Sequence, residues 1–130
     1  MLYVIPGNPV PLARARFSKH KKVYDSQKSQ KMFDGITLQG QHQGEVLIGP
    51  LHLDIKFFMP IPSSASKRKR EELGGQCHVS RPDTDNMIKY YLDIAVEAGL
   101  LIDDCLVSVI TARKIYGKEP RTEFTLSVIK

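Results

Sequence analysis

Apolar and polar residues alternate along residues 51–59, and this pattern constrains the fold more than any other part of the chain. In an extended backbone, side chains at every second position share one face of a sheet. The alternation therefore predicts a half-buried strand, which Pro60 and Pro62 end. The apolar face consists of Leu51, Leu53, Ile55, Phe57 and Met59, and the polar residues between them are His52, Asp54 and Lys56.

A second strong pattern lies at residues 85–98, where apolar residues recur at helical spacing. This pattern predicts a helix with one buried face. Gly99 follows at the position where a helix end favours a left-handed residue. The apolar stripe consists of Ile88, Tyr91, Leu92, Ala95 and Ala98.

Weaker signals predict two further helices. Ser26 is placed to cap a helix that continues to about residue 39, and residues 63–73 predict a short exposed helix ended by Gly74 and Gly75. The inner face of the first of these helices is expected to consist of Met32, Phe33, Ile36 and Leu38.

The remaining segments predict three strands and their connections. Residues 1–5, 106–116 and 122–129 read as strands, and residues 117–121 suit a hairpin loop between the last two. Residues 8–16 contain two prolines and predict an extended or irregular segment. The order β-α-β-α-α-β-β then predicts an α+β fold in one domain, residues 1–130, with helices packed on one mixed sheet.

Composition sets the broad class of the protein. The hydrophobic fraction of 42% and the charged fraction of 25% are ordinary for a globular domain. No apolar run is long enough to cross a bilayer and the N-terminus does not resemble a signal peptide, so we expect a cytoplasmic protein with no membrane partner. Cys77 and Cys105 show no CxxC spacing and are expected to be free thiols, and the four scattered histidines are expected to be surface or satisfied residues.

Charge is distributed unevenly along the chain. Residues 83–104 contain six acids and one base, Lys89, although the whole chain has a net charge of +5. A basic body around an acidic pocket suits an enzyme that binds a polyanion and holds a hard metal ion. Oxygen ligands alone favour Mg²⁺, with Mn²⁺ as a substitute, over zinc.

The spacing within this window suggests a metal site. Asp83 lies two residues before Asp85 in extended chain, and Lys89 follows Asp85 by one helical turn. An antiparallel return after the helix could bring Asp104 back toward them. Asp83, Asp85 and Asp104 would then bind the metal, and Lys89 would stabilise developing negative charge.

The same residues also have a purely structural interpretation. An aspartate at a helix N-terminus is a common cap, and the pair Asp103-Asp104 after a helix is often a turn. Lys89 would then be an ordinary i,i+4 partner of Asp85. The spacing alone leaves both interpretations open.

The run from Arg81 to Lys89, RPDTDNMIK, and the later segment DDCLV from Asp103 resemble the signature of the RusA family of Holliday junction resolvases. In that family a D-x-D-N-x-x-K segment opens a helix and a D-D-x-x-V segment follows it. The resemblance is close over residues 81–116 and looser toward the N-terminus.

The resemblance implies a RusA-like, Mg²⁺-dependent endonuclease that acts as a homodimer and cuts two opposed strands of a four-way DNA junction. The catalytic and metal-binding aspartates of the family would fall on Asp83, Asp85 and Asp104, and its helix lysine on Lys89. Asp103 would be the adjacent family acid, with a less defined role.

Basic residues outside the acidic window fit a DNA partner. Phosphate contacts supply affinity and salt dependence but read little sequence. Arg14 and Arg16 share a face in an extended chain and are the preferred contacts, although each basic run also suits a solvated surface. The other candidate DNA contacts are Lys19, Lys21, Lys22, Arg81 and Lys114.

Two alternatives to a junction resolvase remain. The same metal site could serve a nuclease for other branched DNA, such as flaps or forks. Alternatively, the acidic cluster could consist only of caps and turns in a non-catalytic DNA-binding protein. A phosphoacceptor domain is disfavoured because the Asp-Asp pair follows the other aspartates instead of preceding them.

Overall fold

A computed structural model describes residues 1–13, 16–17, 23–24 and 26–130, with the backbone alone for 16–17 and 23–24. The proposed DNA contacts Arg14, Lys19, Lys21 and Lys22 lie outside the described residues. Arg16 belongs to strand β2 (Arg16–Phe17), which pairs antiparallel with β3 (Val23–Tyr24).

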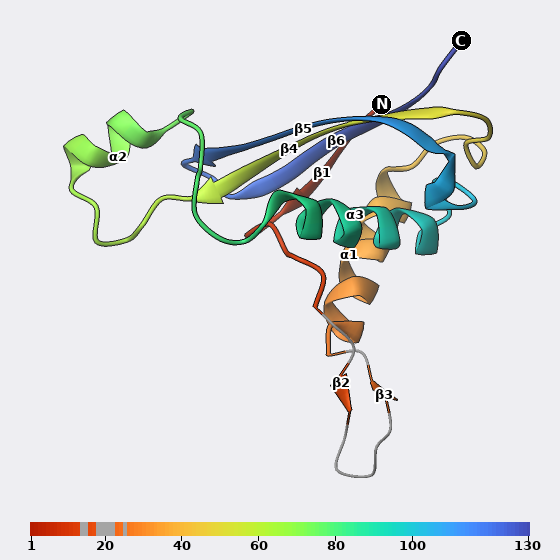
Figure 1. Cartoon of the computed structure of the whole chain (residues 1–130), viewed down its shortest axis with the longest axis horizontal. Helices are drawn as coiled ribbons and strands as arrows, with labels where there is room; N and C mark the ends of the chain where they lie inside the picture. Colours follow the sequence, from red (N-terminus) through yellow and green to blue (C-terminus); the bar gives the residue numbers. More distant parts are fainter. Residues whose placement is uncertain (14–15, 18–22, 25) are drawn as a thin grey trace.

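A four-stranded mixed sheet forms the centre of the molecule (Figure 1). Its order is β1-β6-β4-β5, with β1 (Leu2–Pro6), β6 (Arg121–Val128), β4 (Leu51–Pro60) and β5 (Val107–Gly117). β4 runs parallel to β5 and antiparallel to β6, and β6 runs antiparallel to β1. The expected α+β class and element order are confirmed, with β2 and β3 as additions.

The predicted alternation in β4 is confirmed. Its five odd-numbered apolar residues, from Leu51 to Met59, are at most 3% exposed, because they face two helices that cover one side of the sheet (Figure 1). These helices are α1 (Lys28–Gln41) and α3 (Thr84–Glu97). α3 ends as predicted, with Gly99 at a φ of 82°. Its buried face is wider than the predicted stripe, since Met87, Tyr90 and Ile94 are also buried.

The expected inner face of α1 is wrong for three of its four residues. Met32, Phe33 and Ile36 are about 60% exposed or more, and only Leu38 is buried. The helix instead turns polar groups inward, where they find partners. Asp34 accepts a hydrogen bond from Tyr90, and the Gln41 side-chain amide bonds both the N–H and the carbonyl of Val4 in β1, at 2.8 and 2.6 Å. The helix also lacks the predicted Ser26 cap, because its N-cap is Gln27.

The predicted hairpin between β5 and β6 is also wrong. Residues 117–121 do connect the two strands, but β4 lies between them and hydrogen-bonds to both. β4 is the most thoroughly buried strand, and the central position gives it a neighbour on each side.

The remaining α-helix, α2 (Lys67–Leu73), lies beyond the end of the sheet, away from α1 and α3 (Figure 1). Ser66 caps it by accepting a hydrogen bond from the N–H of Lys69, and Arg68 forms an i,i+4 ion pair with Glu72 at 3.5 Å. Within the described part of the chain, no helix is long and apolar enough to cross a membrane.

Candidate active site

The chain reaches Asp83 through a loop that is held against β5. The N–H of His78 donates to the carbonyl of Lys114, and the N–H of Tyr116 donates to the carbonyl of Gln76, both at 2.9 Å. The Lys114 Nζ then donates to the carbonyls of Ser80 and Pro82, at 2.6 and 2.8 Å. Lys114 therefore fixes the turn that delivers Asp83 to the start of α3, a role that its interpretation as a DNA contact had missed.

Asp83 occupies the N-cap position of α3 but makes no side-chain capping hydrogen bond. Its carboxylate is exposed, as is that of Asp85 in the first helical turn. The purely structural interpretation expects Asp83 to cap the helix through its side chain, and this capping hydrogen bond is not formed. Both carboxylates also lie near the positive end of the helix dipole, which favours negative charge there.

A charged stripe continues from Asp85 along the solvent side of α3. Lys89 is exposed one turn further on, and Asp93 lies 3.9 Å from Lys31 of α1 in a weak ion pair. No salt bridge between Lys89 and a carboxylate is found among the described residues. The stripe runs from the N-terminal to the C-terminal end of the helix.

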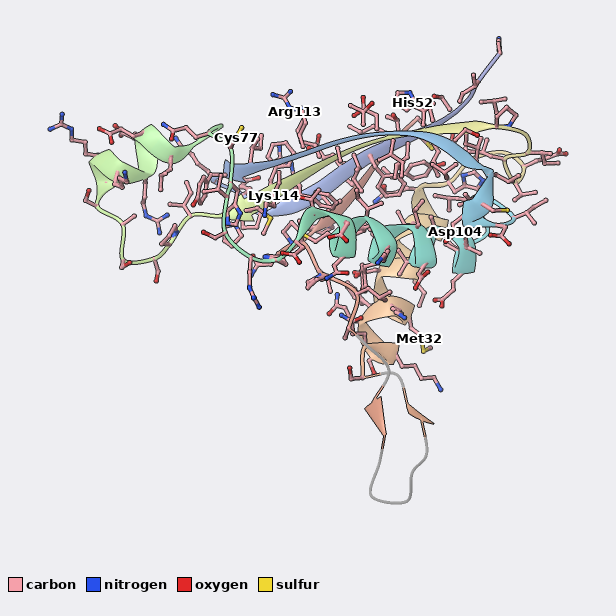
Figure 2. The ribbon with its side chains drawn as sticks, in the orientation of Figure 1. Met32, His52, Cys77, Asp104, Arg113 and Lys114 are labelled. Carbon is pink, nitrogen blue, oxygen red and sulfur yellow. The ribbon has the colours of Figure 1, made fainter. Side chains whose placement is uncertain are left out.

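Asp103 and Asp104 lie at that C-terminal end, at the start of the 3₁₀ helix η1 (Asp104–Leu106) (Figure 2). Asp103 accepts a hydrogen bond from the N–H of Cys105 at 3.0 Å, which lowers the pKa of Asp103, and its hydrogen bond with Asp104 adds to this effect. The pKa of Asp104 is raised, first by the hydrogen bond with Asp103, then by burial and the negative charges of Asp103 and Asp93. Asp103 thus has the turn role expected of it, whereas Asp104 has no such role.

The expected return of Asp104 to Asp83 and Asp85 does not occur within one chain. Asp104 shares a surface hollow with Asp93 and Glu97, at the opposite end of α3 from Asp83. A helix of 14 residues spans about 21 Å. Accordingly, no group of three histidine, cysteine or acidic side chains suited to a metal is found in the described ranges. The predicted ligands form two half-sites, one at each end of α3.

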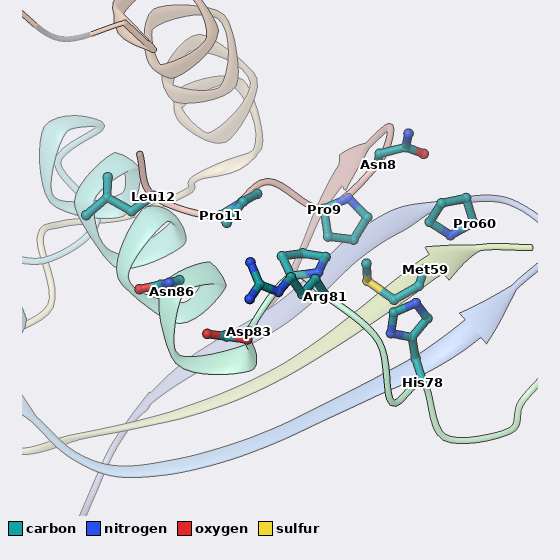
Figure 3. Close-up of a pocket in the computed structure, with 11 residues that line it drawn as sticks. Asn8, Pro9, Pro11, Leu12, Met59, Pro60, His78, Arg81, Asp83 and Asn86 are labelled. Atoms are coloured by element: carbon teal, nitrogen blue, oxygen red, sulfur yellow. The ribbon is translucent and has the colours of Figure 1, made fainter. Parts of the chain in front are cut away.

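A pocket beside Asp83 was not anticipated from the sequence (Figure 3). It lies between the proline-rich segment after β1, the end of β4 and the loop before α3. Arg81, expected to contact DNA, is exposed and lines this pocket. The two prolines in residues 8–16 were the only sequence signal of an unusual surface here.

His78 at the pocket wall also departs from the expectation of a surface or satisfied histidine. Its Nδ1 is buried and lacks a hydrogen-bond partner among the described residues. Burial and then the positive charge of Lys114 lower the pKa of His78, and the polar backbone of Ser80 opposes them in part. The neutral ring is therefore favoured.

Two comparisons with known proteins found proteins of similar sequence. The family model described as Endodeoxyribonuclease RusA matches residues 6–127. A protein of Bacillus subtilis (strain 168) named "Uncharacterized protein YqaN" is 33% identical over 130 residues, covering 93% of this chain and 91% of the relative. The family match spans both half-sites, the pocket and the whole of β4 and β5. The chain therefore belongs to the RusA family of endodeoxyribonucleases.

Proposed function

We propose that this protein is a Mg²⁺-dependent endodeoxyribonuclease that resolves four-way DNA junctions by paired, symmetric cuts as a homodimer. The observation that carries the proposal is the family match together with the two acidic half-sites at the ends of α3. A four-way junction offers two equivalent scissile phosphates, and a two-fold dimer offers two equivalent sites.

The half-sites fit a divalent metal in kind, because all their donors are carboxylate oxygens. Asp83 and Asp85 would hold the ion from one end and Asp104 from the other. When bound, Mg²⁺ would lower the pKa of a water molecule and neutralise charge on the phosphodiester. Lys89, exposed one turn from Asp85, would stabilise negative charge that develops on the phosphate oxygens.

If two chains share each active site, the half-site of one chain can meet the other half-site of its partner. In a dimer with antiparallel α3 helices, Asp83 and Asp85 of one chain would lie beside the partner's Asp104. A two-fold axis near the middle of the helix would also place Lys89 opposite the partner's Asp93. That pairing of opposite charges would offset part of the repulsion between two acidic helix faces.

The exposed apolar residues of α1 support this face as the dimer interface. Met32, Phe33 and Ile36 are the side chains that the sequence pattern had assigned to the core, and they lie exposed on a helix that packs against α3. Ile102, next to the Asp103-Asp104 pair, is 60% exposed as well. A second copy covering this face would bury the apolar patch and complete the active site together.

Mixed dimers test the shared site directly. Asp83→Asn and Asp104→Asn should each abolish cutting alone, with junction binding retained because less charge repels the phosphates. If sites are shared, a mixture of the two variants forms heterodimers in which one site has both substitutions and the other has none. Cleavage of single strands should then return, as nicks without paired cuts.

The matched control is a mixture of Asp83→Asn with Asp85→Asn, which damages both sites of every heterodimer. This mixture should stay inactive. A mixture of Asp83→Asn and Asp104→Asn that also stays inactive, although heterodimers are detected by mass, would contradict the shared site. Activity of either single variant at the wild-type rate would contradict the assignment of its aspartate.

The substrate is tested with four-way junctions, flaps, replication forks and linear duplex at equal concentration, with Mg²⁺ and with EDTA. Symmetric paired cuts on the junction alone, lost in EDTA, are expected. Preferential cutting of flaps or forks would indicate a nuclease for other branched DNA. Salt-sensitive binding without cutting under any divalent metal would indicate a non-catalytic DNA-binding protein.

A further inference from the structure

The pocket beside Asp83 has a volume of about 600 Å³, within the range of about 300–1,000 Å³ that is usual for small-ligand sites. Its lining is apolar over the larger part, and we call the apolar lining residues its floor and the polar ones its rim. The metal and dimer roles proposed above use only Asp83 among its lining residues. The floor includes Pro9, Pro11, Leu12 and Met59, and the rim includes His78, Arg81 and Asn86.

One wall of the pocket is pinned to α3 by its backbone. The N–H of Val10 donates to the Tyr91 hydroxyl and the N–H of Leu12 donates to the carbonyl of Asn86, both at 3.0 Å. Pro9 and Pro11 alternate with these residues and have no N–H that needs a partner. Their rings are therefore free to present apolar surface to the pocket without leaving an unsatisfied donor.

The opposite wall is equally constrained. The ring of His78 packs on Tyr116 with centroids 4.8 Å apart, while its backbone is hydrogen-bonded to β5. Arg81 extends from the loop that Lys114 holds, and Figure 3 shows its side chain between the Pro11 wall and Asp83. The pocket thus offers a neutral imidazole and a guanidinium, two groups that can hydrogen-bond the polar edge of a nucleobase.

We propose that this pocket receives one unstacked nucleobase of the DNA strand whose phosphate lies at Asp83. The proposal rests on the proposed function, because it takes the phosphate at Asp83 to be the scissile one. The apolar floor would bury the face of the base, and the rim of His78, Arg81 and Asn86 would meet its polar edge. The positive charge of Arg81 would offset the approach of the strand to the acidic residues.

A base at a branch point suits this pocket better than a base within a duplex. Extruding a base costs stacking and pairing energy, and the cost is least where pairing is already disrupted. A pocket next to the metal ligands would then couple the recognition of a branch to the placement of the adjacent phosphate. Linear duplex would have to supply the full extrusion cost before its phosphate reached Asp83.

The test places 2-aminopurine, whose fluorescence rises when it leaves the base stack, at each position flanking the branch of a synthetic junction. EDTA is present throughout, so binding is measured without cleavage. The wild-type protein is expected to raise emission severalfold at one position. Pro11→Phe, which fills the pocket, and His78→Ala, which removes one wall, should each remove this rise at saturating protein.

Matched controls separate the pocket from general effects. Pro11→Ala removes the proline without filling the space, and His52→Ala removes a histidine on β4 outside the pocket. Both should keep the wild-type rise. A rise that survives in Pro11→Phe and His78→Ala would overturn the proposal, as would a bound junction with no brightened position.

Failure of the proposed function is recognised separately. A protein that binds junction and duplex alike and never cuts would contradict the resolvase assignment. The pocket is then tested with a single-stranded oligonucleotide carrying 2-aminopurine, in which no branch is needed. A shift in emission in the wild type that Pro11→Phe abolishes would support base binding, and no shift would overturn it.

Discussion

The hydroxyl of Tyr90 donates a hydrogen bond of 2.6 Å to Asp34, and this contact joins α3 to α1 in the interior of the protein. Tyr90 is fully buried and Asp34 is 2% exposed. Among the described residues, Gln30 is the other side chain that bonds this carboxylate, at 3.1 and 3.2 Å. A charged group can be buried here because two donors share its desolvation cost.

Tyr90→Phe should destabilise the protein by about 1–3 kcal/mol, because it leaves the buried Asp34 carboxylate short of a donor. Urea denaturation followed by circular dichroism measures the change. The double variant Tyr90→Phe with Asp34→Leu removes both partners and should recover part of the loss. Equal stability of the wild type and Tyr90→Phe would show that the bond contributes nothing.

Stability should also fall in alkaline solution. Burial, followed by the hydrogen bond and charge of Asp34, raises the pKa of Tyr90 above its ordinary value of 10.0. A raised folded-state pKa means that the contribution is complete below pH 10 and is lost progressively as the pH rises above it. Tyr90→Phe should show a weaker decline than the wild type between about pH 10 and 11 in thermal unfolding.

Lys114→Met should slow junction cleavage by about 10- to 100-fold, because the turn before Asp83 loses two hydrogen bonds and the carboxylate moves. Junction affinity and its salt dependence should change little, since the Lys114 ammonium is occupied by the protein. A lower salt slope and weaker binding would instead identify Lys114 as a phosphate contact. The control is Arg113→Met, an exposed residue beside it on β5.

Phe33→Glu should weaken the dimer by at least about tenfold, the usual effect of losing a buried aromatic anchor. Sedimentation over a range of concentrations measures this change, and cleavage should fall in parallel because the proposed dimer shares each site between two chains. Val109→Glu, at an exposed residue of β5 on the sheet face away from the helices, serves as the control. An unchanged dimer in Phe33→Glu would exclude this face as the interface.

Gly117→Ala should destabilise the protein by about 1–3 kcal/mol, because the added Cβ would lie 2.9 Å from the Cβ of Phe58. Phe58 has little freedom to move, since the Arg121 guanidinium lies 3.7 Å from its ring centroid. Gly40→Ala, in α1 with open space around it, should instead stabilise by about 0.5–1 kcal/mol. Thermal unfolding of both variants measures the contrast.

The parts of the fold that follow from local pattern were predictable. The alternation in β4 follows the two-residue period of a strand, and the apolar stripe of α3 follows the 3.6-residue period of a helix. Both periods hold in any chain. The face of α1 was not predictable from hydropathy, because Asp34 and Gln41 turn inward to partners on Tyr90 and Val4 that lie far away in sequence. The hairpin prediction was wrong for a similar reason. The residue pattern identifies β5 and β6 as strands, but it does not show that β4 lies between them.

The candidate site was likewise predictable only in part. The motif placed Asp83, Asp85 and Lys89 on one exposed end of α3, as the structure has them. Asp104 could not be placed by spacing, because its position depends on the route of the chain after the helix. The pocket could not be predicted at all, since Pro11, Met59 and His78 meet only in the folded chain.

The Gln41 side chain has a consequence for how copies of this protein can associate. By bonding both backbone groups of Val4, it occupies the outward-facing donor and acceptor of β1, the outer strand on that side of the sheet. On the other side, Gln76 and His78 occupy the outward backbone groups of β5 near Tyr116. A strand from a second molecule would have to displace these contacts before it could extend the sheet. Extension of the sheet is thereby hindered at these two places, which leaves the helical face as the surface that the proposed pair of chains would use.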